Sequence, residues 1–242
     1  MKIVAKTDVG MVRESNQDSY TTGELPNGVA WAVVCDGMGG AAGGNVASST
    51  AVKVIAEQIT SSFRPGMSAN SIKNMMVSAI NAANISVYDI SCSNSKLYGM
   101  GTTVVCAIVM EHTAYIAHAG DSRAYIVSHG ALTQLTRDHS VVQELVEHGK
   151  ITALEAKRHP NKNIITRAVG VSREILVDFS EQEMKDGDVL LLCTDGLTNF
   201  VESDEMCDLT KDDMFYEFAE RLVDRANKNG GGDNVTVVAV TY

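Results

Sequence analysis

Proline and aromatic residues are scarce in this chain, and long hydrophobic runs are absent. Only 3 of the 242 residues are proline and 5% are aromatic, whereas 45% are hydrophobic. This balance excludes disordered, collagen-like and low-complexity proteins. No apolar stretch approaches the roughly 20 residues that a membrane span needs, so we expect no membrane partner. The N-terminus turns polar too early for a signal peptide, which predicts a soluble, cytoplasmic protein.

Positive charge is also in short supply. The chain has 20 Lys plus Arg against 30 Asp plus Glu, which gives a formal net charge of −10. Such a chain has no general electrostatic attraction for nucleic acid, so we expect no nucleic-acid partner. It could instead favour metal cations wherever its carboxylates converge.

The cysteines follow no disulfide, zinc or catalytic pattern. Their number, 5, is odd, no CxxC motif occurs, and none is followed six residues later by arginine. We therefore expect buried free thiols in a reducing compartment and no cysteine-based phosphate chemistry.

Hydrophobic periodicity predicts an α+β protein. Short apolar runs and alternation favour strands at 2–7, 29–35, 102–110, 113–119, 123–128, 131–136, 174–179, 188–193 and 234–241. Apolar residues at helical spacing favour helices at 43–60, 71–90, 139–148 and 213–228. Residues 152–172 are polar and irregular. Tight links between strands favour antiparallel pairing, and helices grouped apart from the strands predict a sheet core with helices packed outside. No repeat, linker or composition break divides the chain, so we expect one domain over residues 1–242.

Four aspartates stand at the ends of predicted strands, next to glycine. They occur in Asp36-Gly37, Gly120-Asp121, Asp195-Gly196 and Gly232-Asp233. Each alone is typical of a turn, because Asp and Gly favour turn conformations. Together they indicate more: two unpaired carboxylates ~4 Å apart repel by about 4 kcal/mol at an effective dielectric constant of 20. Several would be tolerated only at the surface or around a cation, and oxygen ligands favour Mg²⁺ or Mn²⁺.

A further acid, Asp18, follows Arg13 by five residues in a polar, extended stretch. A guanidinium group matches the bidentate geometry of phosphate oxygens. The alternative for this pair is a surface ion pair of little consequence.

Ordered short motifs along the whole chain resemble one family. The motifs are Arg13-Glu-Ser-Asn-Gln-Asp18, Asp36-Gly-Met-Gly-Gly40, Gly99-Met-Gly-Thr-Thr103, Gly120-Asp-Ser-Arg123, Leu135-Thr-Arg-Asp-His-Ser140, Asn163-Ile-Ile-Thr-Arg-Ala-Val-Gly170, Thr194-Asp-Gly-Leu197 and Gly231-Gly-Asp-Asn-Val-Thr236. In this order the set resembles the metal-dependent protein phosphatases (protein phosphatase 2C) in their compact bacterial form. The resemblance implies a sandwich of two antiparallel β-sheets flanked by α-helices on both sides, with a binuclear metal centre at one end.

The resemblance also implies a set of metal ligands. Asp36, Asp195 and Asp233 would hold a first Mn²⁺ or Mg²⁺ ion. Asp36 and the carbonyl oxygen of Gly37 would hold a second, and Asp18 would act on it through water.

Further roles follow from the same resemblance. Asp121, with Asp195, would form a third and weaker metal site. Arg13 would bind the substrate phosphate, so that Arg13, Asp36 and Asp195 would be the catalytic residues. Residues 139–170 would include the flap segment beside the site.

The activity implied is that of a protein serine/threonine phosphatase, in which a metal-bridging hydroxide attacks phosphoserine or phosphothreonine. Its partners would be phosphorylated proteins, including Ser/Thr kinases and their substrates, and we expect a monomer.

The sequence departs from the family at two positions. Bacterial relatives usually carry His and Glu where this chain has Ala41 and Gly44. A histidine there is a candidate general acid, and general acids typically contribute about 10²–10⁴-fold. We therefore expect slower hydrolysis of alkyl than of aryl phosphates. The departure leaves open a catalytically weak or inactive phosphatase-fold module that binds or regulates.

A second alternative is a dinucleotide-binding fold. The run Gly37-Met-Gly-Gly-Ala-Ala42 fits the G-x-G-x-x-A fingerprint. However, a helix is predicted at 71–90 where that fold needs a strand, and Asp36 would repel a pyrophosphate.

Overall fold

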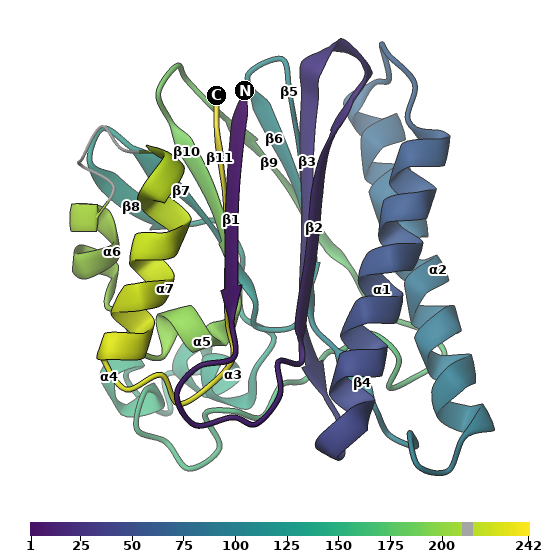
Figure 1. Cartoon of the computed structure of the whole chain (residues 1–242), viewed down its shortest axis with the longest axis vertical. Coiled ribbons are helices and arrows are strands. Elements are labelled where there is room, and N and C mark those ends of the chain that lie inside the picture. Colours follow the sequence, from purple (N-terminus) through teal and green to yellow (C-terminus); the bar gives the residue numbers. More distant parts are fainter. Residues whose placement is uncertain (210–214) are drawn as a thin grey trace.

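The computed structural model describes residues 1–209 and 215–242, apart from the side chains of residues 41 and 42. Two antiparallel sheets pack face to face, and helices cover the outer face of each (Figure 1). This confirms the predicted α+β sandwich. The predicted helix at 213–228 lies partly outside the described residues, because positions 213 and 214 are not among them.

The first sheet has the strand order β1-β11-β10-β7-β8. Its strands are β1 (Lys2–Asp8), β7 (Arg123–Ser128), β8 (Ala131–Gln134), β10 (Val189–Cys193) and β11 (Val235–Thr241). The helices on its side are α5 (Asp195–Thr198), α6 (Ser203–Leu209) and α7 (Phe218–Lys228), the last preceded by the 3₁₀ turn η2 (Phe215–Glu217).

The second sheet has the order β2-β3-β5-β6-β9, with a short β4 paired to β3. Its strands are β2 (Asp18–Leu25), β3 (Val29–Met38), β4 (Gly101–Thr102), β5 (Val104–Met110), β6 (Thr113–Ala119) and β9 (Asp178–Glu183), with the 3₁₀ turn η1 (Pro26–Gly28) between β2 and β3. Two long helices, α1 (Gly40–Ser62) and α2 (Ala69–Ser93), cover it. The connection from β8 to β9 carries α3 (Val141–Glu147) and α4 (Ala153–Ala156).

The helix α1 is followed by α2 rather than by a strand, and the sheets are antiparallel. The dinucleotide-binding alternative is therefore wrong.

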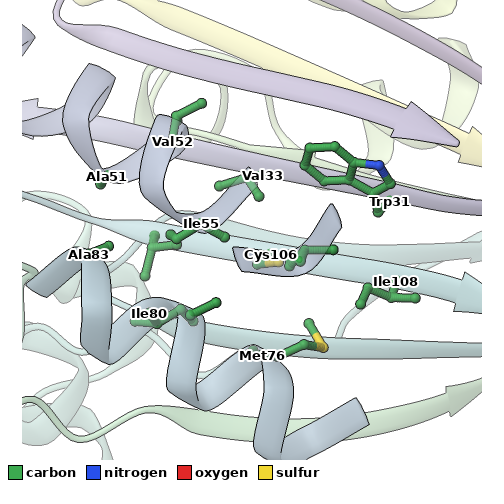
Figure 2. Close-up of a cluster of buried hydrophobic side chains, with 14 of the residues drawn as sticks. Trp31, Val33, Ala51, Val52, Ile55, Met76, Ile80, Ala83, Cys106 and Ile108 are labelled. Atoms are coloured by element: carbon green, nitrogen blue, oxygen red, sulfur yellow. The ribbon is translucent and has the colours of Figure 1, made fainter. Parts of the chain in front are cut away.

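The strand β3 is a continuous apolar run because both of its faces are buried. Its side chains point in turn to opposite faces of the sheet. Ala32 and Val34 pack between the two sheets, whereas Trp31 and Val33 pack against α1 and α2, as Figure 2 shows for the helix side. Both faces of β3 are thus buried, and the strand holds its C-terminal end rigidly in place.

The strands β2 and β9 differ from the prediction, and the short helices α4, α5 and α6 were not predicted. The strand β9 begins at Asp178, four residues later than predicted, because its partner β6 ends at Ala119 and leaves residues 174–176 without a strand opposite them. The strand β2 was missed, because its threonine-rich sequence lacks an apolar run although it pairs with β3 along its length.

The chain termini lie together at one end of the sandwich, and the loops that follow β1 and β3 lie at the other (Figure 1). No helix among the described residues is both long and apolar enough to cross a membrane.

Candidate metal centre

The strand register brings the predicted acids to the same end of the sandwich. In the β2–β3 pair, Asp18 lies opposite Asp36. In the other sheet β10 and β11 are antiparallel neighbours, so the end of β10 lies beside the start of β11. Asp195 is the first residue of α5, just after β10, and Asp233 lies just before β11. Strands far apart in the sequence therefore converge on one cluster.

A pocket of about 730 Å³ opens at this point. It is lined by these predicted site residues: Arg13, Asp36, Gly37, Asp121, Asp195 and Asp233. Asp18 is not among the lining residues and is only 7% exposed, so it lies beneath the pocket rather than in its wall.

Burial and mutual repulsion disturb the acid equilibria of this cluster. Burial, followed by the negative charges of Asp18 and Asp195, raises the pKa of Asp36 well above its usual range. Burial and the charge of Asp233 raise the pKa of Asp195, whose Oδ2 accepts from Asn199 Nδ2 at 2.9 Å. Burial, with a smaller contribution from the neighbouring carboxylates, raises the pKa of Asp18 and that of Asp121 each to about 7. Carboxyl groups packed this way favour either protons or a cation.

Two oxygen atoms of the cluster have no partner among the described residues. Asp18 Oδ1 and Asp195 Oδ1 are both buried and accept no hydrogen bond. A buried acceptor left unsatisfied costs about 1–3 kcal/mol. A bound divalent cation would satisfy such oxygens, so the donor set fits Mg²⁺ or Mn²⁺, which prefer carboxylate oxygens.

The other oxygen of Asp18 is held firmly. Asp18 Oδ2 accepts hydrogen bonds from Thr194 Oγ1 at 2.9 Å and Thr236 Oγ1 at 2.7 Å. These two hydroxyl groups come from the opposite sheet and fix the orientation of the carboxylate.

Arg13 lies at the rim of the pocket and is 53% exposed. Its Nη2 donates to Asp233 Oδ2 at 2.8 Å, and this hydrogen bond is the main cause of the raised pKa of the guanidinium group. The ion pair considered from the sequence is present, but its partner is Asp233 rather than Asp18. One guanidinium edge remains available to the pocket.

Gly37 occupies a position where only glycine fits. A Cβ there would lie 2.6 Å from the backbone oxygen of Gln17 and would clash with the backbone oxygen of Gly44. The N–H of Gly37 donates to that Gln17 oxygen at 3.2 Å. The close packing brings the end of β3 against the start of α1 and against the residue before β2.

A sequence model of protein phosphatase 2C matches residues 12–236 of this chain. The chain belongs to the protein phosphatase 2C family. It is 37% identical to a putative protein phosphatase 2C-type of Streptococcus pyogenes, over 99% of this chain and 97% of that protein. It is 38% identical to the serine/threonine phosphatase stp of Listeria monocytogenes, over 97% of this chain and 93% of that protein.

Solved structures of serine/threonine phosphatases are also similar to this chain. The S. agalactiae serine/threonine phosphatase superposes with a TM-score of 0.93 at 32% identity, over 100% of this chain and 99% of that one. The catalytic domain of the serine/threonine protein phosphatase PstP, in complex with 2 manganese ions, gives a TM-score of 0.85 at 33% identity, over 98% and 96% of the two chains. The predicted family and fold are confirmed.

Thr103 and Asn234 line this phosphatase 2C pocket and were not singled out from the sequence. Thr103 Oγ1 accepts from the N–H of Asp36 at 2.9 Å and shares a 2.7 Å hydrogen bond with Ser122 Oγ. Asn234 Oδ1 accepts from the N–H of Gln17 at 2.8 Å, and its amide nitrogen donates to two further backbone oxygens. Both residues lie in motifs quoted above, but nothing in those motifs says which loop each would contact.

The flap segment (residues 139–170) reaches the same pocket. Asn163 and Ile165 line it, and Ile165 forms an isolated β-bridge with Ser140. The N–H of Val141 also donates to Ile164 O at 2.9 Å, so the two ends of the segment are joined.

Proposed function

We propose that this protein is a manganese- or magnesium-dependent serine/threonine phosphatase that removes phosphate from phosphoserine and phosphothreonine in other proteins. The observation that carries the proposal is the pair of buried, unpartnered oxygens of Asp18 and Asp195 beside the other carboxylates of the pocket. An inactive binding module would have no use for mutually repelling buried acids, so these oxygens favour the enzyme.

The metal ligands of this proposal come from both sheets. Asp36, Asp195 and Asp233 would hold one ion, and Asp36 with the carbonyl oxygen of Gly37 would hold the other. When bound, the two ions neutralise the phosphate dianion and lower the pKa of a water molecule from about 15.7 towards neutrality.

Asp18 and Asp121 complete the ligand set. Asp18 would act on the second ion through a water molecule, because it lies beneath the pocket. Asp121, with Asp195, would hold a third and weaker ion.

Thr103 and Arg13 would orient the Asp36 carboxylate and the substrate phosphate. Thr103 accepts from the backbone N–H of Asp36 and keeps its carboxylate over the pocket. Arg13 uses one nitrogen for Asp233, and a guanidinium group has five N–H donors. Its remaining donors can bind the non-bridging oxygens of a phosphate and stabilise the charge that develops on them.

The residues that line this pocket bear on how the leaving group would be protonated. Among the described residues that line it there is no histidine, lysine or cysteine. The absence of a cysteine there disfavours a phosphocysteine route, and the absence of a histidine leaves an alkoxide leaving group without an imidazole acid. We therefore propose faster turnover of aryl than of alkyl phosphates.

The setting we propose is cytoplasmic signalling, with the enzyme acting as a monomer and a single domain on Ser/Thr kinases and their substrates. Buried free thiols at Cys35, Cys106 and Cys193 support a reducing compartment. The flap segment, through Asn163 and Ile165, would contact the substrate next to the phosphate.

The test is hydrolysis of p-nitrophenyl phosphate and of a phosphothreonine peptide with Mn²⁺, Mg²⁺ or EDTA. We expect turnover of both that requires the metal. Metal-independent turnover would contradict the mechanism, and an absence of turnover by the metal-loaded protein would favour the binding module.

A further inference from the structure

The short segment that carries Asp121 is held from both sides by two consecutive residues. On one side, the N–H of Gly120 donates to His139 Nδ1 at 3.1 Å and its carbonyl accepts from the His139 N–H at 2.9 Å. On the other side, Arg123 donates to the Asp138 carboxylate from Nε at 2.8 Å and from Nη2 at 2.6 Å. Asp121 lies between these two attachments and faces the pocket.

Little room exists for this segment to shift. Gly120 has a φ of +118°, and a Cβ there would lie 2.7 Å from the Thr103 side chain. Ser122, on the other side of Asp121, shares a hydrogen bond with the same threonine. The placement of Asp121 therefore depends on how closely Gly120 is kept against Thr103.

The His139 ring is itself anchored. Its side chain is fully buried, and Nε2 donates to Asp178 Oδ2 at 3.1 Å. The other oxygen of Asp178 accepts from Arg167 at 2.7 Å, within the flap segment. A neutral ring with its proton on Nε2 satisfies both contacts, because Nδ1 must be free of a proton to accept from Gly120.

We propose that His139 is a positioning residue for the metal-facing carboxylate of Asp121, acting through the backbone N–H of Gly120. This inference rests on the proposed function, since it assigns Asp121 to a metal. The ring takes its orientation from Asp178, so the Asp121 loop and the end of the flap segment share one anchor. Partners that orient a ligand typically change metal affinity or activity by about 10–100-fold when removed.

The same region could instead be read as a separate metal site. Ligand atoms of His118, His139 and Asp178 lie within 4.8 Å of one another. The two rings, however, are stacked at 4.7 Å with an interplanar angle of 8°, and both nitrogens of His139 are already engaged. An ion on either His139 nitrogen would have to displace Gly120 or Asp178, so the geometry favours the positioning role.

Two substitutions test the hydrogen bonds of the two His139 ring nitrogens separately. His139→Asn keeps an acceptor close to the Nδ1 position and loses the contact to Asp178. His139→Gln keeps a donor close to the Nε2 position and loses the acceptor for Gly120. His118→Asn is the matched control, because His118 stacks on His139 and bonds to Arg137 O, whereas the Gly120 N–H donates to His139.

The Mn²⁺ concentration for half-maximal p-nitrophenyl phosphate hydrolysis is the first readout. We expect an increase of about tenfold in His139→Gln, with kcat recovered at saturating Mn²⁺, and changes under about threefold in His139→Asn and His118→Asn. Calorimetric titration with Mn²⁺ should show the same order, and hydrogen exchange at the Gly120 amide should speed up only in His139→Gln.

A double-mutant cycle then tests whether the effect passes through Asp121. In an Asp121→Asn background, His139→Gln should raise the Mn²⁺ requirement no further. A wild-type Mn²⁺ response in His139→Gln, or an undiminished effect in that background, would overturn the proposal. Zn²⁺ binding to the wild type that His118→Asn abolishes would overturn it in favour of a metal site. Wild-type protein without metal-dependent turnover would instead defeat the proposed function, and that result is distinct from all of these.

Discussion

At the scale of single residues, the pocket stores electrostatic repulsion that a metal would relieve. Asp195 has one buried oxygen without a partner and a pKa raised by burial and by Asp233. Substituting its carboxylate by an uncharged amide removes a proposed metal ligand and also removes a source of repulsion. Activity and metal-free stability should therefore move in opposite directions.

We predict that Asp195→Asn abolishes Mn²⁺-dependent hydrolysis and raises the melting temperature in EDTA by a few degrees, since ~1 kcal/mol corresponds to about 2–4 °C at this chain length. Calorimetric scans with EDTA and with Mn²⁺ would measure both. Asp188→Asn is the control for a buried aspartate outside the pocket; its Oδ2 accepts from the Lys185 N–H, so this change should lower stability. Retained turnover in Asp195→Asn would remove this residue from the metal centre.

Position 41 is the place at which the family resemblance leads us to expect a general acid. The resemblance implies histidine at this position, where the sequence has Ala41, whose side chain lies outside the described residues, and the described pocket lining offers no imidazole. We predict that Ala41→His raises kcat for a phosphothreonine peptide by about tenfold or more and leaves kcat for p-nitrophenyl phosphate nearly unchanged, because only the alkoxide needs a proton. Ala41→Asn serves as a polar control. Equal gains on both substrates would argue against general acid catalysis.

At the scale of elements, what the sequence could predict depended on whether the signal was local. The buried strand β3 and the acid that follows its apolar run were predictable, because both features are contiguous. The strand β2 was not, because its pairing with β3, rather than its own polar sequence, makes it a strand. Thr103 and Asn234 were missed for the same reason, since their roles are defined by loops distant in sequence.

The junction between β3 and α1 gives a prediction at this scale. A methyl group at Gly37 would meet the backbone of both Gln17 and Gly44, which cannot yield without moving the start of α1. We predict that Gly37→Ala lowers stability by about 1–3 kcal/mol, as overpacking does, and weakens Mn²⁺ binding. Gly187→Ala, in open space with a φ of +87°, serves as a destabilising control outside the pocket and should leave Mn²⁺ binding unchanged. Calorimetry on both variants would check this, and normal Mn²⁺ affinity in Gly37→Ala would contradict it.

At the scale of the whole molecule, the end of β3 and the start of α5 lie opposite the chain termini (Figure 1), and Asp36 and Asp195 lie at these two points. Two sheets contribute them, so separation of the sheets during unfolding would dismantle the cluster. Metal binding and global stability should therefore be linked, because only the folded state assembles the ligands.

Proton binding to the buried carboxyl groups should make the stability of the metal-free protein depend on pH. In the metal-free protein, Asp18 and Asp121 have pKa values near 7, against 3.8 as the ordinary value. A carboxyl group whose pKa is raised by folding contributes stability at low pH, and this contribution is lost as pH rises through the folded pKa. Between pH 5 and 7.5 the melting temperature in EDTA should therefore fall.

Saturating Mn²⁺ binds the deprotonated carboxylates, so it should protect more strongly as pH rises. Asp18→Asn, which cannot titrate, should flatten the EDTA curve, and a melting temperature in EDTA that rises across this range would refute the assignment of these two carboxyl groups.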